Sequence, residues 1–261
     1  MSVPNEIDLA PLLAGFLIFS RVAALLMALP ATGSKAVPPM ARMAAALPLA
    51  AVLYPTVVGA KLPSTIPDLL VASVAEVGVG VAVGFVVGMV SGALSLASEV
   101  IGMKIGLSLG GMLDPMSGTH GSPLGVLAQV LATGMFFGLD LHLACIKAIG
   151  ESLTIAPPGM ITQPLAVGGV LLSVATSVMS LGVQLAGPVI AFALLVNLAL
   201  MLLGRMAPGL QLFFSISTSV TVFTGIVVLA VALPTMIAVE RGALAGLWTP
   251  VHALFVAVSG G

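Results

Sequence analysis

The sequence contains very few charged residues. Only 7% of its 261 residues are charged, with eight basic and nine acidic side chains, whereas a soluble domain carries about 25%. The hydrophobic fraction is 59% and the mean hydropathy is +1.25. So few charges cannot cover a water-exposed surface, and a net charge of −1 argues against a nucleic-acid-binding surface. The composition predicts an integral membrane protein.

Cysteine and the large aromatic residues are also nearly absent. The single cysteine, Cys145, excludes an intrachain disulfide and a cysteine-rich metal site. With one Trp and one Tyr, the chain lacks the aromatic belts that usually mark the two membrane interfaces. Glycine is abundant at 30 residues, and small residues let helices pack closely. Either other subunits cover much of this surface, or the source genome simply favours alanine and glycine.

Residue patterns for catalysis or metal binding are missing as well. No two of the three histidines have metal-ligand spacing, and there is neither a nucleophile elbow nor a phosphate-binding loop. The Asp140-Leu-His142 run is explained most simply by a helix end that reaches water. We therefore expect no enzyme activity, no metal and no cofactor.

Long apolar runs separated by Pro and Gly predict about six membrane-spanning segments, since one span needs about 20 apolar residues. We expect an all-α polytopic membrane protein with a single domain over residues 1–261, whose kinked or broken helices pack into a multi-subunit helical assembly. Pro188 should kink the longest segment, and a final apolar stretch, 240–258, is placed at an interface. The six segments are 11–29, 40–58, 69–96, 124–149, 165–206 and 212–233.

Four charged residues lie within or beside the apolar segments: Arg21, Glu76, Glu99 and Lys104. Charges at membrane depth are costly and usually pair with one another or face water. Arg21 can pair with Glu76 or with Glu99, and we interpret such a pair as a structural tie rather than an ion pathway.

Glycines at every fourth position mark one face of the third segment. On a helix this spacing forms a groove that another helix can approach at backbone distance. The partner helix belongs either to another subunit or to the same chain. The four glycines are Gly80, Gly84, Gly88 and Gly92.

The most informative segment is 98–123, which lies between two apolar stretches. Gly110-Gly111 and Asp114-Pro115 both oppose helix continuation. Irregular backbone beside a bilayer must find hydrogen bonds in protein or trapped water, because lipid offers none. This segment is therefore expected to line a cavity or contact a partner.

Several short motifs occur in order along nearly the whole chain, and together they resemble the FliR/SctT family of type III secretion export-gate proteins. They are Phe19-Ser-Arg21, Leu29-Pro30, Val37-Pro38-Pro39, Glu99-Val-Ile-Gly102-Met-Lys-Ile-Gly106-Leu-Ser108, Asp114-Pro115-Met-Ser-Gly118, Phe136-Phe137-Gly-Leu-Asp140-Leu-His142, Ala156-Pro157-Pro158-Gly159, Leu195-Val196-Asn197-Leu198-Ala199 and Arg205-Met-Ala-Pro208. The sequence departs from the family at Lys104, where a glutamine is common.

The resemblance implies a structural and gating subunit of the flagellar protein export channel in the bacterial inner membrane, at the flagellar basal body. One copy would join several copies of FliP and FliQ, with FlhB and FlhA associated, and unfolded substrates would pass through. The loop after the third segment would plug the pore, and its glycines would let it move aside. The plug residues implied are Gly106, Leu109, Gly110, Gly111, Met112, Leu113, Asp114, Pro115 and Met116.

Three other functions remain open on the residues. An injectisome export gate of the SctT type fits the same motifs. A small-solute secondary transporter would suit broken helices, but it predicts matching halves, and the glycine loop has no counterpart after Gly159. An intramembrane enzyme would need a nucleophile–base pair, and none has a recognised spacing.

Overall fold

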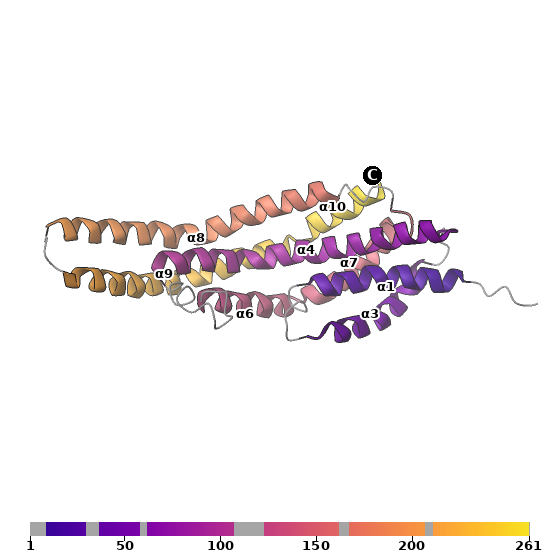
Figure 1. The fold of residues 1–261 in the computed structure, drawn as a ribbon, viewed down its shortest axis with the longest axis horizontal. Coiled ribbons are helices and arrows are strands. Elements are labelled where there is room, and N and C mark those ends of the chain that lie inside the picture. Colours follow the sequence, from indigo (N-terminus) through magenta and orange to yellow (C-terminus); the bar gives the residue numbers. More distant parts are fainter. Residues whose placement is uncertain are drawn as a thin grey trace, which may run out of the picture. The chain divides into compact units, whose positions relative to one another are not determined.

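The computed structural model describes residues 9–29, 37–57, 62–106, 123–161, 167–206 and 211–260. Within these ranges the secondary structure consists of helices, with no strand, which confirms the expected all-α class (Figure 1). Among the described residues, five helices are long and apolar enough to cross a bilayer, or six if the broken pair α6 and α7 forms one span. The number of apolar segments thus agrees with the sequence-based expectation.

Contacts divide the chain into two compact units, and α4 and α8 contribute to both. The first unit comprises Met1–Met89, Phe137–Val174 and Gly246–Gly261, and the second comprises Val90–Phe136 and Ala175–Ala245. The helices are α1 (Ala10–Ala28), α3 (Pro39–Leu53), the short 3-10 helix η1 (Tyr54–Val57), α4 (Ile66–Ile105), α6 (Pro123–Gly138), α7 (Leu141–Ile155), α8 (Val167–Met206), α9 (Gln211–Ala245) and α10 (Trp248–Ser259).

Local sequence explains where α4 begins and ends. At its start the Thr65 hydroxyl accepts a hydrogen bond from the Asp68 N–H (3.3 Å) and donates one to the Asp68 carboxylate (2.6 Å), which caps the first turn. After Ile105 the backbone of Gly106 has a φ of +84°, a left-handed conformation that glycine adopts without strain at helix ends. The loop predicted after the third segment therefore starts at a defined helix end.

The helices differ from the predicted segments in three places. α4 continues to Ile105 rather than ending near 96, so residues 98–105 of the segment 98–123 are helix. The predicted span 124–149 is interrupted at Asp140, whose φ is +54°. α9 runs through Pro234 to Ala245 instead of ending at 233. α8 is one continuous helix with Pro188 inside it, and the expected kink there stays a prediction.

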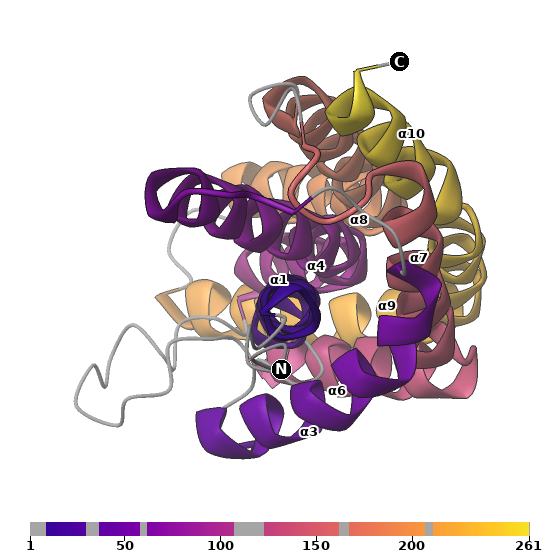
Figure 2. The ribbon, with the colours of Figure 1, turned by 90° about the vertical axis from the view of Figure 1, so that its right-hand side faces the viewer.

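In the first unit, α1 packs closely against the N-terminal half of α4, and Figure 2 shows α1 with α3 and α4 on either side. A Cβ at Gly80 would collide with the Arg21 carbonyl oxygen, and one at Gly84 would lie 2.6 Å from the Cβ of Ala28. Two of the four ladder glycines thus contact a helix of the same chain. A Cβ at Gly92 would have no neighbour within 4 Å.

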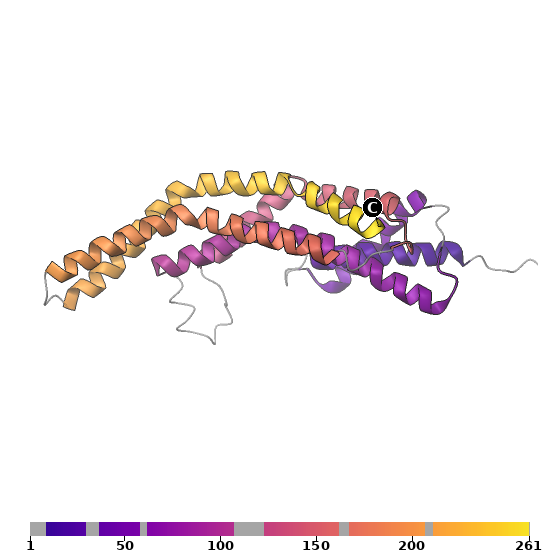
Figure 3. The same ribbon diagram turned by 90° about the horizontal axis from the view of Figure 1, so that it is seen from above.

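In the second unit, α8 and α9 run side by side (Figures 1 and 3), and a hydrophobic core joins them to α4 and α6. Glycines again permit close approach: a Cβ at Gly182 of α8 would collide with the Leu96 side chain, and one at Gly225 of α9 with Ile105. The core residues are Ala93, Leu94, Ala97, Ile101, Ile105, Ala128, Leu185, Ala186, Val189 and Met236.

We predict that Gly80→Ala destabilises the chain while Gly92→Ala does not. The new methyl group at position 80 meets backbone and forces α1 away, a change that costs about 1–3 kcal/mol in packed interiors. Alanine at position 92 meets open space and improves helix propensity by up to about 1 kcal/mol. Thermal unfolding of both variants in detergent, followed by circular dichroism, tests this, and equal midpoints would contradict it.

Candidate functional site

The polar centre of the first unit is the guanidinium group of Arg21, which is fully buried on α1. Its Nε donates to Oε2 of Glu76 on α4 at 2.5 Å. Nη1 donates to the Ser152 hydroxyl and Nη2 to the Ala156 carbonyl oxygen, both at 2.9 Å. One side chain therefore connects α1 to α4 and to the C-terminal end of α7.

The second oxygen of Glu76 binds a turn that follows α7. Oε1 of Glu76 accepts a hydrogen bond from the Gly159 N–H at 3.0 Å. The Met160 N–H donates to the Pro157 carbonyl oxygen at 3.0 Å, and Gly159 has a φ of +78°, as at the third position of a type II turn. The Pro-Pro-Gly sequence thus presents a backbone donor to the buried carboxylate.

Each nitrogen of the Arg21 guanidinium group and both carboxylate oxygens of Glu76 have a protein partner. Glu76 and Ser152 are also fully buried, and the guanidinium group lies at the C-terminus of α7, where the helix dipole favours positive charge. Buried ion pairs are strongly destabilising when one partner is removed. Of the two partners that the sequence left open for Arg21, the structure selects Glu76, and the network is a structural tie within the first unit.

The other charged candidates lie elsewhere. Glu99 and Lys104 are on the part of α4 that belongs to the second unit, and Lys104 is exposed. Of the predicted plug, only Gly106 is described, and Leu109 through Met116 lie outside the described residues. Gly88 of the glycine ladder lies on α4 and is partly exposed.

Sequence reasoning missed three parts of these arrangements. Ser152 had no distinguishing neighbour in the sequence, although its hydroxyl is a ligand of Arg21. Gly182 and Gly225 do not form a ladder, so their contacts with α4 had no periodic signal. Glu240 is fully buried on α9, and neither of its carboxylate oxygens has a hydrogen-bond partner among the described residues. Its position inside a long apolar run was the signal that could have marked it.

The described residues contain no group of three or more His, Cys, Asp or Glu side chains that could hold a metal ion. Arg21, Glu76, Ser152 and the backbone groups of Ala156 and Gly159 bind one another, and this network holds the helices in position. The role of this network in the first unit is therefore to hold α1, α4 and α7 together.

Comparison with known proteins decides the family. Residues 12–246 match the model of the bacterial export proteins, family 1. The chain belongs to this family. It is also 32% identical over 220 residues to the flagellar biosynthetic protein FliR of Caulobacter vibrioides (strain ATCC 19089 / CIP 103742 / CB 15), covering 83% of this chain and 87% of that protein. The resemblance to the FliR/SctT family is confirmed, and this member is a multi-pass membrane component of the flagellar type III protein export apparatus.

We predict that Glu76→Gln strongly destabilises the first unit. Glutamine keeps the size of the side chain but leaves the buried Arg21 charge unpaired, which costs about 3–5 kcal/mol. The matched control is Glu151→Gln, because Glu151 is exposed on α7 and exposed substitutions stay within about 0.5 kcal/mol.

Thermal unfolding in detergent compares the two variants. The double variant Arg21→Met with Glu76→Met should recover most of the loss, because no buried charge then remains unpaired. A loss in Glu76→Gln no larger than that in Glu151→Gln would contradict the structural role of the ion pair.

Proposed function

We propose that this chain is a structural and gating subunit of the flagellar export gate in the bacterial inner membrane. It assembles with FliP and FliQ, and FlhB and FlhA associate with the complex. The family match over residues 12–246 is the observation that carries this proposal. The flagellar name of the Caulobacter relative favours a flagellar host over an injectisome.

Large apolar faces that the chain leaves uncovered support an assembly role. Within the most hydrophobic window of each span, only 22% of residues are buried for Val167–Met206 and 11% for Ser219–Ser259. These faces contact lipid or other proteins. Because the sequence has almost no Trp or Tyr to form interfacial belts, we assign a large part of them to partner helices.

The gating role is assigned to the loop between α4 and α6, residues 106–121, with Leu109, Met112, Leu113 and Met116 as its apolar obstruction. The core of the second unit holds the helices at both ends of this loop. Ile105 is fully buried in that core beside Gly225, and Leu124 packs against it. Anchors at both ends let the middle of the loop be displaced while its ends stay in the core, as we propose for a plug.

The assembly is tested by co-expression of the tagged chain with FliP and FliQ from the same genome, followed by native mass spectrometry in detergent. We expect a stable complex that holds one copy of this chain. A monomer or homodimer that retains neither partner would overturn the gate assignment and favour the small-solute transporter.

The plug is tested by replacing Leu109, Met112, Leu113 and Met116 with serine. We expect more leakage of small ions through the assembled complex, because hydrated serine side chains cannot seal an apolar constriction. The control is Met103→Ser, since Met103 is an exposed methionine on α4 just before the loop. Complex that assembles normally and leaks no more than this control would refute the plug.

A further inference from the structure

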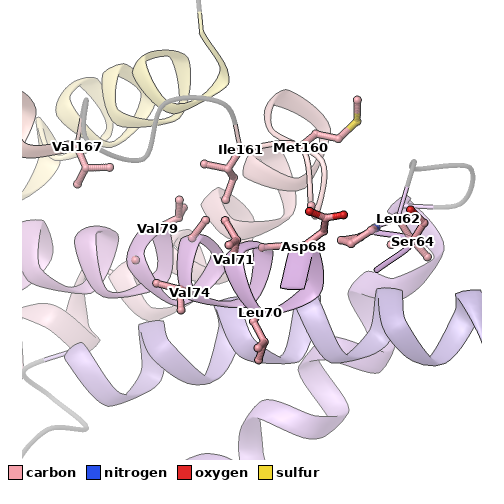
Figure 4. Close-up of a pocket in the computed structure, with 15 residues that line it drawn as sticks. Leu62, Ser64, Asp68, Leu70, Val71, Val74, Val79, Met160, Ile161 and Val167 are labelled. Atoms are coloured by element: carbon pink, nitrogen blue, oxygen red, sulfur yellow. The ribbon is translucent and has the colours of Figure 1, made fainter. Parts of the chain in front are cut away.

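A groove in the first unit is lined in part by Gly159 and Met160 of the turn described above. It has a volume of about 1160 Å³ and is lined by the N-terminal half of α4, by Met160 and Ile161, and by Val167 at the start of α8 (Figure 4). This volume is slightly above the usual range for small-molecule sites, about 300–1,000 Å³. It is large enough for a lipid.

The polarity of the groove changes along α4. Ser64 and Asp68 form the polar end, and the helix then lines the groove with Val71, Val74 and Val79. From Asp68 to Val79 the helix rises about 17 Å at 1.5 Å per residue. Half the hydrocarbon thickness of a bilayer is about 15 Å. The groove therefore has the length and the polar-to-apolar order of one lipid in one leaflet.

The polar end of the groove carries a negative charge, that of Asp68. Asp68 is exposed, and its Oδ2 atom accepts a hydrogen bond from Thr65. Among the described residues that line the groove, Asp68 is the one charged side chain. The Asp68 carboxylate repels an anionic headgroup and attracts an ammonium group.

The floor of the groove is open to an acyl chain. A Cβ at Gly78 would have no neighbour within 4 Å. Val71 and Val74 are 71% and 74% exposed, so the described residues leave them largely uncovered. An acyl chain lying there would touch the α4 backbone at Gly78 and both valine side chains.

We propose that this groove is a binding site for one phospholipid with an ammonium headgroup, of the phosphatidylethanolamine type. The ammonium group lies at Asp68, and one acyl chain follows α4 past Gly78 to Val79. The site belongs to the isolated chain, so it does not depend on the proposed gate or on partner subunits.

Native mass spectrometry of the purified, delipidated chain tests the site. The probes are 1-palmitoyl-2-oleoyl phosphatidylethanolamine and the phosphatidylglycerol with the same acyl chains. We expect one tightly retained phosphatidylethanolamine per chain and weaker retention of phosphatidylglycerol. Equal retention of both lipids, or retention of neither, would overturn the proposal.

Two pairs of variants separate the head and chain contributions. Asp68→Asn should lower the preference for phosphatidylethanolamine by up to about fivefold, as expected for an exposed charge pair. Glu151→Gln, which removes an exposed acid outside the groove, should leave the preference unchanged. An unchanged preference in Asp68→Asn would overturn the assignment of the headgroup site.

Gly78→Leu fills the groove floor and should reduce occupancy by both lipids. The matched control is Gly169→Leu, because a Cβ at Gly169 of α8 also has no neighbour within 4 Å and this residue is outside the groove lining. Circular dichroism confirms that both variants are folded. Full occupancy in folded Gly78→Leu would overturn the assignment of the acyl-chain path.

Discussion

The first unit depends on one constraint: a full charge in an apolar interior must be neutralised within the protein. Arg21 meets this requirement through Glu76, Ser152 and the Ala156 carbonyl oxygen. Because these groups come from α1, α4 and α7, satisfying one side chain fixes the positions of three helices. The Gly159 N–H completes the carboxylate's hydrogen bonds and fixes the turn after α7 as well.

Close helix contacts make this geometry possible. Gly80 brings the backbone of α1 near α4 at the level of Arg21, so the guanidinium group can reach Glu76. In the second unit Gly182 and Gly225 bring α8 and α9 to the other half of α4. Helix association in membranes has little hydrophobic driving force, and close packing of small residues replaces it. The long apolar faces of α8 and α9 remain largely uncovered by the described residues of the chain.

Several features could be predicted from residues alone because their causes are local. Apolar run length indicated the spans, and Pro and Gly residues indicated the breaks between them. The ends of helices were harder to predict. α4 continues past residue 96 because Ile101 and Ile105 are buried in a core that sequence periodicity does not reveal. At Asp140 the helix breaks in an apolar run without Pro, where the backbone is left-handed.

By itself the sequence determined that the protein is an all-α membrane protein of the FliR/SctT type, because composition, run length and ordered motifs are properties of the chain. Only the tertiary structure decided which acid pairs with Arg21 and which glycines receive a neighbouring helix. Glu76 and Glu99 are equally plausible partners in the sequence, and Gly84 and Gly92 occupy equivalent places in one ladder. Their contacts differ because helix packing brings together segments that are far apart in the chain.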